Sequence, residues 1–136
     1  MRKLVGILAI ISVAIVSCCI TASAEESMKC NNGPIDKTIG GTAWLGYLCE
    51  DDKSLVFVTQ KDNPASPFVF MLMVVDGEYR LHGEGNGAKI YTKLAYEELK
   101  DYSWEDKNQV IVKIKQSLQQ LQQVENDAEK PNVVKK

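Results

Sequence analysis

The side chains of this chain best suited to chemistry are one histidine and a carboxylate near it. Glu84 follows His82 by two residues, and a carboxylate beside an imidazole is a pairing that general acid–base catalysis uses. No Gly-x-Ser-x-Gly motif accompanies this pair, so a serine nucleophile is not indicated. We expect His82 to be an ordinary residue at a strand end. A small secreted hydrolase that uses His82 with a nearby carboxylate is the alternative function.

Glycines alternate with other residues just after this pair, in the segment Gly83-Glu84-Gly85-Asn86-Gly87. A phosphate-binding loop would end in Gly-Lys-Ser/Thr, and a dinucleotide-binding motif would have a third glycine three residues after the second. Ala88 and Lys89 follow instead, so neither pattern is complete. We interpret the segment as a strand-to-helix turn in which glycine supplies positive φ values.

Acidic residues gather at Glu50-Asp51-Asp52, with Asp62 in the next loop. A calcium-binding loop alternates its acidic ligands with other residues, and this run does not. We expect a solvated turn here, and we predict neither a metal nor a cofactor for the chain.

The first 24 residues have the layout of a signal peptide. Arg2 and Lys3 precede an uncharged, largely apolar run from Leu4 to Ile20, and Ala22-Ser23-Ala24 matches a cleavage site of small residues. We predict cleavage after Ala24 and a periplasmic or secreted protein. Two alternatives stay open: an uncleaved membrane anchor, and a lipoprotein, since Ile15-Val16-Ser17-Cys18 is similar to a lipobox whose Cys18 would be acylated.

Cleavage after Ala24 leaves two cysteines, Cys30 and Cys49. In an oxidising compartment such a pair indicates a disulfide. It would close a loop of about 20 residues and stabilise the fold by about 3 kcal/mol in the chain-entropy model. A zinc site would need more ligands than two distant cysteines and one histidine provide.

The charge of the processed chain argues against polyanionic partners. Loss of Arg2 and Lys3 lowers the net charge from −2 to −4, and the remaining basic residues form no long run. We therefore predict no nucleic-acid partner, and a membrane partner only if Cys18 carries a lipid. A protein is the expected partner, and the oligomeric state stays open.

Strand signals precede helix signals along the chain, which is typical of an α+β fold with an antiparallel sheet. We predict about four strands followed by two C-terminal helices in a single domain over residues 43–124. An irregular lead-in (residues 25–42) precedes this domain, and a disordered tail (residues 125–136) follows it. The expected strands are 43–49, 54–60, 68–75 and 78–82, and the expected helices are 88–102 and 104–124. Asp76-Gly77 predicts a hairpin, and Ser103 with Asp106 approximates a capping box.

Eight apolar residues follow one another without a break from Phe68 to Val75. Successive strand residues point to opposite faces, so this strand must be buried on both faces or serve an interface. The two helices offer apolar side chains for one face: Leu94, Leu99, Ile111, Ile114, Leu118 and Leu121.

The loop before this strand is the candidate binding loop, through Asp62, Asn63, Pro64, Ser66 and Pro67. Its two prolines restrict it, and a stiffened loop loses less entropy on binding. The alternative is an ordinary connector.

Between Trp44 and Leu99, the chain is similar to small secreted proteins of Gram-negative bacteria that have no assigned function. Two stretches carry this resemblance: Asn63-Pro64-Ala65-Ser66-Pro67-Phe68 and Gly83-Glu84-Gly85-Asn86-Gly87. As a small, exported, sheet-based protein with a disulfide, the chain also resembles periplasmic lysozyme inhibitors in its general organisation. We therefore predict an exported protein that acts by binding another macromolecule, as inhibitors, immunity proteins and effectors do, without chemistry of its own.

The signal-peptide layout leads to a direct test. N-terminal sequencing of the processed protein is expected to begin at Glu25, because the small-residue site ends at Ala24. An acylated N-terminus at Cys18 would identify a lipoprotein instead. Full-length protein retained in membranes would contradict both forms of processing.

Overall fold

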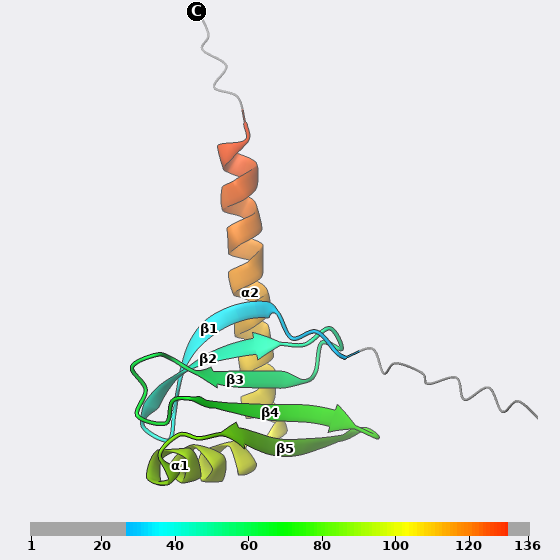
Figure 1. Ribbon diagram of the computed structural model, residues 1–136. Coiled ribbons are helices and arrows are strands. Elements are labelled where there is room, and N and C mark those ends of the chain that lie inside the picture. The colour runs from blue at the N-terminus through cyan, green and yellow to red at the C-terminus, as the bar shows by residue number, and fades with distance from the viewer. Residues whose placement is uncertain (1–26, 131–136) are drawn as a thin grey trace, which may run out of the picture.

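The computed structural model describes residues 27–130, which form a five-stranded antiparallel sheet followed by two helices (Figure 1). The strands occupy the sheet in chain order, so each pairs with its neighbour in sequence. They are β1 (Asn32–Ile39), β2 (Thr42–Leu48), β3 (Leu55–Thr59), β4 (Phe68–Val75) and β5 (Glu78–Gly85), and the helices are α1 (Lys89–Lys100) and α2 (Trp104–Ala128). The predicted α+β class is confirmed. The predicted signal segment with Cys18, and residues 131–136, lie outside the described residues.

Strand β1 corrects the prediction of an irregular lead-in over residues 25–42 and raises the strand number from about four to five. Gly33 and Pro34 resemble turn residues, but an irregularity of register between Asn32 and Ile35 accommodates them within the strand. Gly40 and Gly41, with φ values of 58° and 79°, form the turn into β2.

The hairpin predicted at Asp76-Gly77 is confirmed. Asp76 and Gly77 join β4 to β5 with φ values of 53° and 79°, as a type I′ turn requires. In the turn from β2 to β3, the Asp51 carboxylate accepts hydrogen bonds from the backbone N–H of Ser54 at 2.8 Å and from the Ser54 hydroxyl at 2.6 Å. One member of the predicted acidic turn therefore has a defined structural role.

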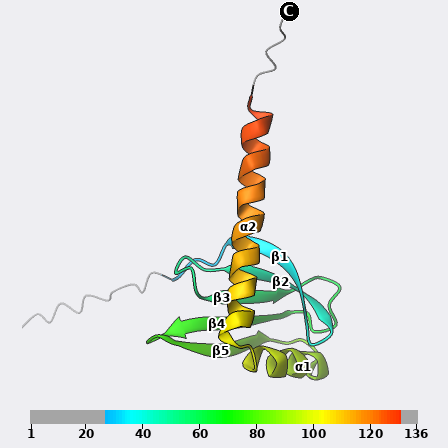
Figure 2. The ribbon, with the colours of Figure 1, turned by 180° about the vertical axis from the view of Figure 1, so that it is seen from behind.

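The core lies between the sheet and the helices, on one side of the sheet. Trp44 is fully buried, its ring lies 5.3 Å from that of Phe70, and its indole N–H donates to the Ile39 carbonyl at 3.1 Å. α1 adds Ala95 and Leu99 to this cluster, and α2 adds Val110, Ile111 and Ile114. Figure 1 shows α2 behind the sheet and Figure 2 shows it in front. Because α1 and α2 contribute to the same core cluster, both helices pack on the same face of the sheet.

Both helices differ in length from their predicted bounds. α1 ends two residues early, at Lys100, and α2 continues to Ala128, four residues into the predicted disordered tail. No glycine or proline interrupts α2 before Pro131. The capping box of α2 is confirmed, since the Ser103 hydroxyl accepts from the Asp106 N–H at 3.1 Å. Neither helix within residues 27–130 is long and apolar enough to cross a membrane.

Four of the six helix side chains expected to shield the sheet do so. Leu99, Ile111 and Ile114 are buried and Leu118 is half-buried against the core. Leu94 and Leu121 are 53% and 62% exposed, so their predicted role is wrong. Leu121 lies in the C-terminal half of α2. Figure 1 shows that the C-terminal end of this helix extends past the sheet.

The predicted disulfide between Cys30 and Cys49 is confirmed and ties the chain before β1 to the end of β2. Two hydrogen bonds accompany it: the Glu50 N–H donates to the Lys29 carbonyl at 2.9 Å, and the Lys29 N–H donates to the Glu50 carboxylate at 3.1 Å. The start of the edge strand is thus held by covalent and polar contacts.

Reduction of this disulfide is expected to lower the free energy of unfolding by about 3 kcal/mol, because the unfolded chain regains the entropy of an open loop. Urea denaturation with and without reductant measures the change. Cys30→Ser combined with Cys49→Ser is the control, since reductant should leave its stability unchanged. Alkylation of both thiols without prior reduction would contradict the pairing.

Candidate functional site

The face of the sheet opposite the helices is apolar across its three central strands. Its side chains are those of Leu45 and Tyr47 on β2, Val56 and Val58 on β3, and Val69, Met71 and Met73 on β4, and we call this set the open face. In the strand register, Leu45, Val58 and Val69 form one row, while Tyr47, Val56 and Met71 form the next. All seven side chains are half-buried, and no described element covers them.

Strand β4 shows how far the eight-residue apolar run is buried. Phe70 and Leu72 are buried under the helices, whereas Val69, Met71 and Met73 stay half-buried on the open face. Burial on both faces, one of the two predicted outcomes, therefore does not occur among the described residues. The β2 and β3 members of the open face were not identified as a site from the sequence, although outward apolar residues in both predicted strands were the available signal.

Polar side chains border the open face on both edges. Arg80, His82 and Glu84 follow one another on the same face of β5, with Met71 opposite His82 and Val69 opposite Glu84. On the other edge, Asp36 lies opposite Leu45, and its carboxylate accepts from the Gln60 amide at 2.8 Å. An apolar centre within a polar rim is the usual anatomy of a protein–protein interface.

The two stretches that carry the sequence resemblance lie against each other at one end of this face. The Asn86 N–H donates to the Pro67 carbonyl at 3.0 Å. A hollow of about 360 Å³ lies beside this contact, lined by Ser66 and Pro67 from the loop, Glu84, Gly85 and Asn86 from the glycine segment, and by Val58, Thr59, Phe68 and Val69. The candidate loop and the candidate turn therefore meet at one hollow that borders the open face.

The glycine segment is not the turn that the sequence predicted. β5 continues through Gly85, and of the three glycines only Gly85, with φ 144°, has a positive φ. At Gly83 a β-carbon would come within 2.7 Å of the Phe70 ring, and at Gly87 it would overlap the Ala65 carbonyl. Close packing, rather than a turn conformation, requires glycine at these two positions.

The predicted binding loop divides into buried and exposed residues. Asn63 is 6% exposed; its amide donates to the Ala43 carbonyl at 2.6 Å and accepts from the Ala65 N–H at 2.8 Å. It therefore holds the loop against β2. Asp62, Pro64 and Pro67 are exposed and Ser66 is half-buried, so the predicted binding role now concerns these four.

His82 lies exposed on the open side of β5, with Glu84 two residues along the same strand. No hydrogen bond joins the His82 and Glu84 side chains within the described part of the chain. None of five hollows on the surface of residues 27–130 is lined by His82. No three His, Cys, Asp or Glu side chains of residues 27–130 group closely enough to hold a metal ion.

The ionisable groups with shifted pKa values lie away from the open face. Burial acts to raise the pKa of Asp51, but hydrogen bonds within its own turn outweigh burial and the pKa is lowered. Hydrogen bonds from Ser103 lower the pKa of Asp106 at the start of α2. Burial raises the pKa of Tyr79 and of Tyr102, both on the helix side. These shifts arise from a turn, a helix cap and core packing.

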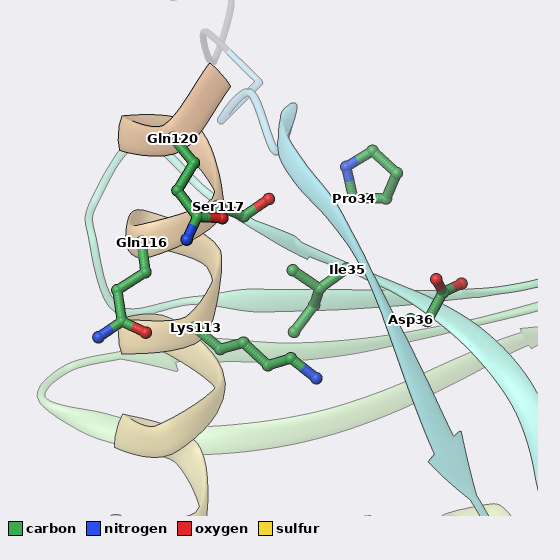
Figure 3. A pocket seen from close by; sticks show the side chains of 7 residues that line it. All are labelled: Pro34, Ile35, Asp36, Lys113, Gln116, Ser117 and Gln120. Carbon is green, nitrogen blue, oxygen red and sulfur yellow. The ribbon is translucent and has the colours of Figure 1, made fainter. Parts of the chain in front are cut away.

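A polar hollow of about 350 Å³ lies between β1 and α2 (Figure 3). Lys113, Gln116, Ser117 and Gln120 line it from α2, and Ile35 points into it from β1. Ser117 has no histidine beside it, because the one histidine of the chain lies on β5. This hollow therefore holds no Ser–His pair for nucleophilic catalysis.

Because comparison with known proteins finds no significant similarity, any functional conclusion rests on the geometry of the site. The chain matches no protein-family model, and neither a curated protein nor a solved structure is significantly similar to it.

The hydrogen bonds of Asn63 lead to a stability prediction. Asn63→Ala is expected to lower the free energy of unfolding by about 1–3 kcal/mol, because the buried Ala65 N–H loses its acceptor and the Ala43 carbonyl loses one of its two donors. Asp62→Ala, at the exposed neighbouring position, is the control and should change stability by no more than about 0.5 kcal/mol. Urea denaturation compares the two, and equal effects would contradict an anchoring role for Asn63.

Proposed function

We propose that the protein is exported and acts by binding another protein through its open face, without chemistry of its own. The observation that carries this proposal is the placement of both helices on one face of the sheet, which leaves an apolar face uncovered within residues 27–130.

The composition of the open face supports a binding role. When one face of an antiparallel sheet is solvated, its outward residues are usually polar. Here three adjacent strands carry Val, Leu, Met and Tyr outward instead. Complete burial of such a side chain stabilises by about 1.5–3 kcal/mol relative to exposure, and half-buried side chains retain part of that gain for an interface. Contiguous apolar patches of this kind usually mark interaction sites.

The surroundings of the open face support a protein as the partner. Arg80 and Glu84 place a positive and a negative charge along the β5 edge of the open face. A protein surface that carries charged groups of both signs would complement this edge. The hollow beside Pro67 offers a recess for one anchoring side chain. Strands hydrogen-bonded on both edges hold the apolar centre in place, so binding costs little conformational entropy.

The test compares two charge insertions on opposite sides of the molecule. Met71→Arg places a cation at the centre of the open face, and Val112→Arg places one on α2, where Val112 is 42% exposed. Proteins captured from periplasmic and culture extracts by the wild type are expected to bind Met71→Arg at least about tenfold more weakly, and to bind Val112→Arg unchanged. Ser66→Arg tests the loop in the same assay.

Circular dichroism and urea denaturation serve as the control that all three variants fold. Equal binding by wild type and Met71→Arg would remove the open face from the interface. Turnover of a substrate that His82→Ala abolishes, together with no captured partner, would replace this proposal with the hydrolase.

A further inference from the structure

A separate hollow lies on the helix side of the sheet, lined by residues of α1, β4 and β5. Figure 1 shows α1 beside β5. Its volume is about 420 Å³. It is lined by Phe68, Phe70 and Gly83 from the strands and by Lys89, Thr92, Lys93 and Tyr96 from α1, and we call these seven residues the aromatic groove. Because Phe70 belongs to the core side of the sheet, this groove is distinct from the open face.

Aromatic rings form the apolar surface of the groove. The Phe68 and Phe70 ring centroids lie 4.9 Å apart, and the Tyr96 centroid lies 6.3 Å from that of Phe70. Phe70 is buried, Phe68 is half-buried and Tyr96 is 38% exposed. The rings of Phe68 and Phe70 pack directly against the backbone of Gly83, where a β-carbon would collide with them. Such a surface suits an aromatic or branched apolar group.

Two ammonium groups border these rings. Lys89 and Lys93 are one turn apart on α1, and like charges at this spacing repel each other. The three ion pairs found within residues 27–130 involve other lysines, and no carboxylate lines the groove. The groove therefore complements an apolar group that carries a negative charge.

The position of β5 at the edge of the sheet favours a peptide as the ligand that carries this negatively charged apolar group. β5 is the last strand of the sheet, and its outer edge pairs with no strand of residues 27–130. Its register with β4 is regular over all eight residues, whereas the other edge strand, β1, contains Pro34 and an irregular register. A regular strand edge offers backbone groups to an extended peptide, which a fatty acid cannot use.

We propose that the aromatic groove binds the carboxyl-terminal end of a peptide or protein chain whose last side chain is apolar. The apolar side chain packs against Phe68 and Tyr96, and the terminal carboxylate meets the ammonium groups of Lys89 and Lys93. The backbone of the bound peptide lies along the outer edge of β5.

The experiment titrates the purified protein with three probes and follows backbone resonances by two-dimensional ¹H–¹⁵N NMR. The probes are the N-acetylated pentapeptide Gly-Ser-Thr-Val-Phe with a free carboxylate, the same peptide as its C-terminal amide, and octanoate. The free-carboxylate peptide is expected to shift the resonances of Gly83, Lys89 and Lys93 and to bind at least about tenfold more tightly than the amide, because a charge-assisted hydrogen bond is lost in the amide.

Charge reversal supplies the matched comparison. Lys89→Glu with Lys93→Glu is expected to abolish these shifts, while Lys61→Glu with Lys113→Glu, which changes net charge equally at exposed positions elsewhere, should bind as the wild type does. Met71→Arg should also bind the peptide normally, which separates this site from the open face. Equal affinity for acid and amide, or octanoate binding at the groove without peptide binding, would overturn the proposal.

Discussion

The connection of three residues between α1 and α2 determines which face of the sheet is covered. α1 ends at Lys100 and α2 begins at Trp104, so this connection reaches at most about 14 Å. Packed layers lie about 10 Å apart, and a helix on each face would place the two helix layers about 20 Å from each other. Once α2 packs on Trp44 and its neighbours, α1 must therefore lie on the same side. The open face is a direct consequence of this short connection.

Much of this arrangement could be predicted from local sequence. The β-branched runs, Asp76-Gly77, the Ser103 cap and the cysteine pair led to four strands, two helices and the disulfide. β1 is hard to predict because Gly33-Pro34 and Gly40-Gly41 resemble turns and because its buried row contains Lys37, whose ammonium lies 5.7 Å from the centre of the Tyr102 ring. This contact lets a charged residue face the core side of the sheet, and it interrupts the alternation that would otherwise have indicated a strand.

The parts of the site that could not be predicted depend on contacts between distant segments. Asn63 looked like a surface residue of a proline-rich loop, and its hydrogen bond to Ala43, 20 residues earlier, gives it a role inside the fold. Gly83 and Gly87 suggested a turn, but their neighbours across the fold, Phe70 and Ala65, are what exclude a side chain. The packing of the proline-containing loop against the glycine segment appears only in three dimensions.

The two faces of the sheet therefore have separate physical roles. Trp44, Phe57 and Phe70 on the helix side are fully buried and supply the core, so substitutions there act on stability. Val58, Val69 and Met71 belong to the same strands but lie half-buried on the other side. Other residue types at these three positions would therefore leave the packing of the core intact. Successive residues of each strand point to opposite sides of the sheet. Packing of the buried side chains on the helix side therefore also fixes where the side chains of the open face lie. A small sheet covered on one side thus presents a rigid apolar surface whose chemistry is largely independent of what holds the fold together.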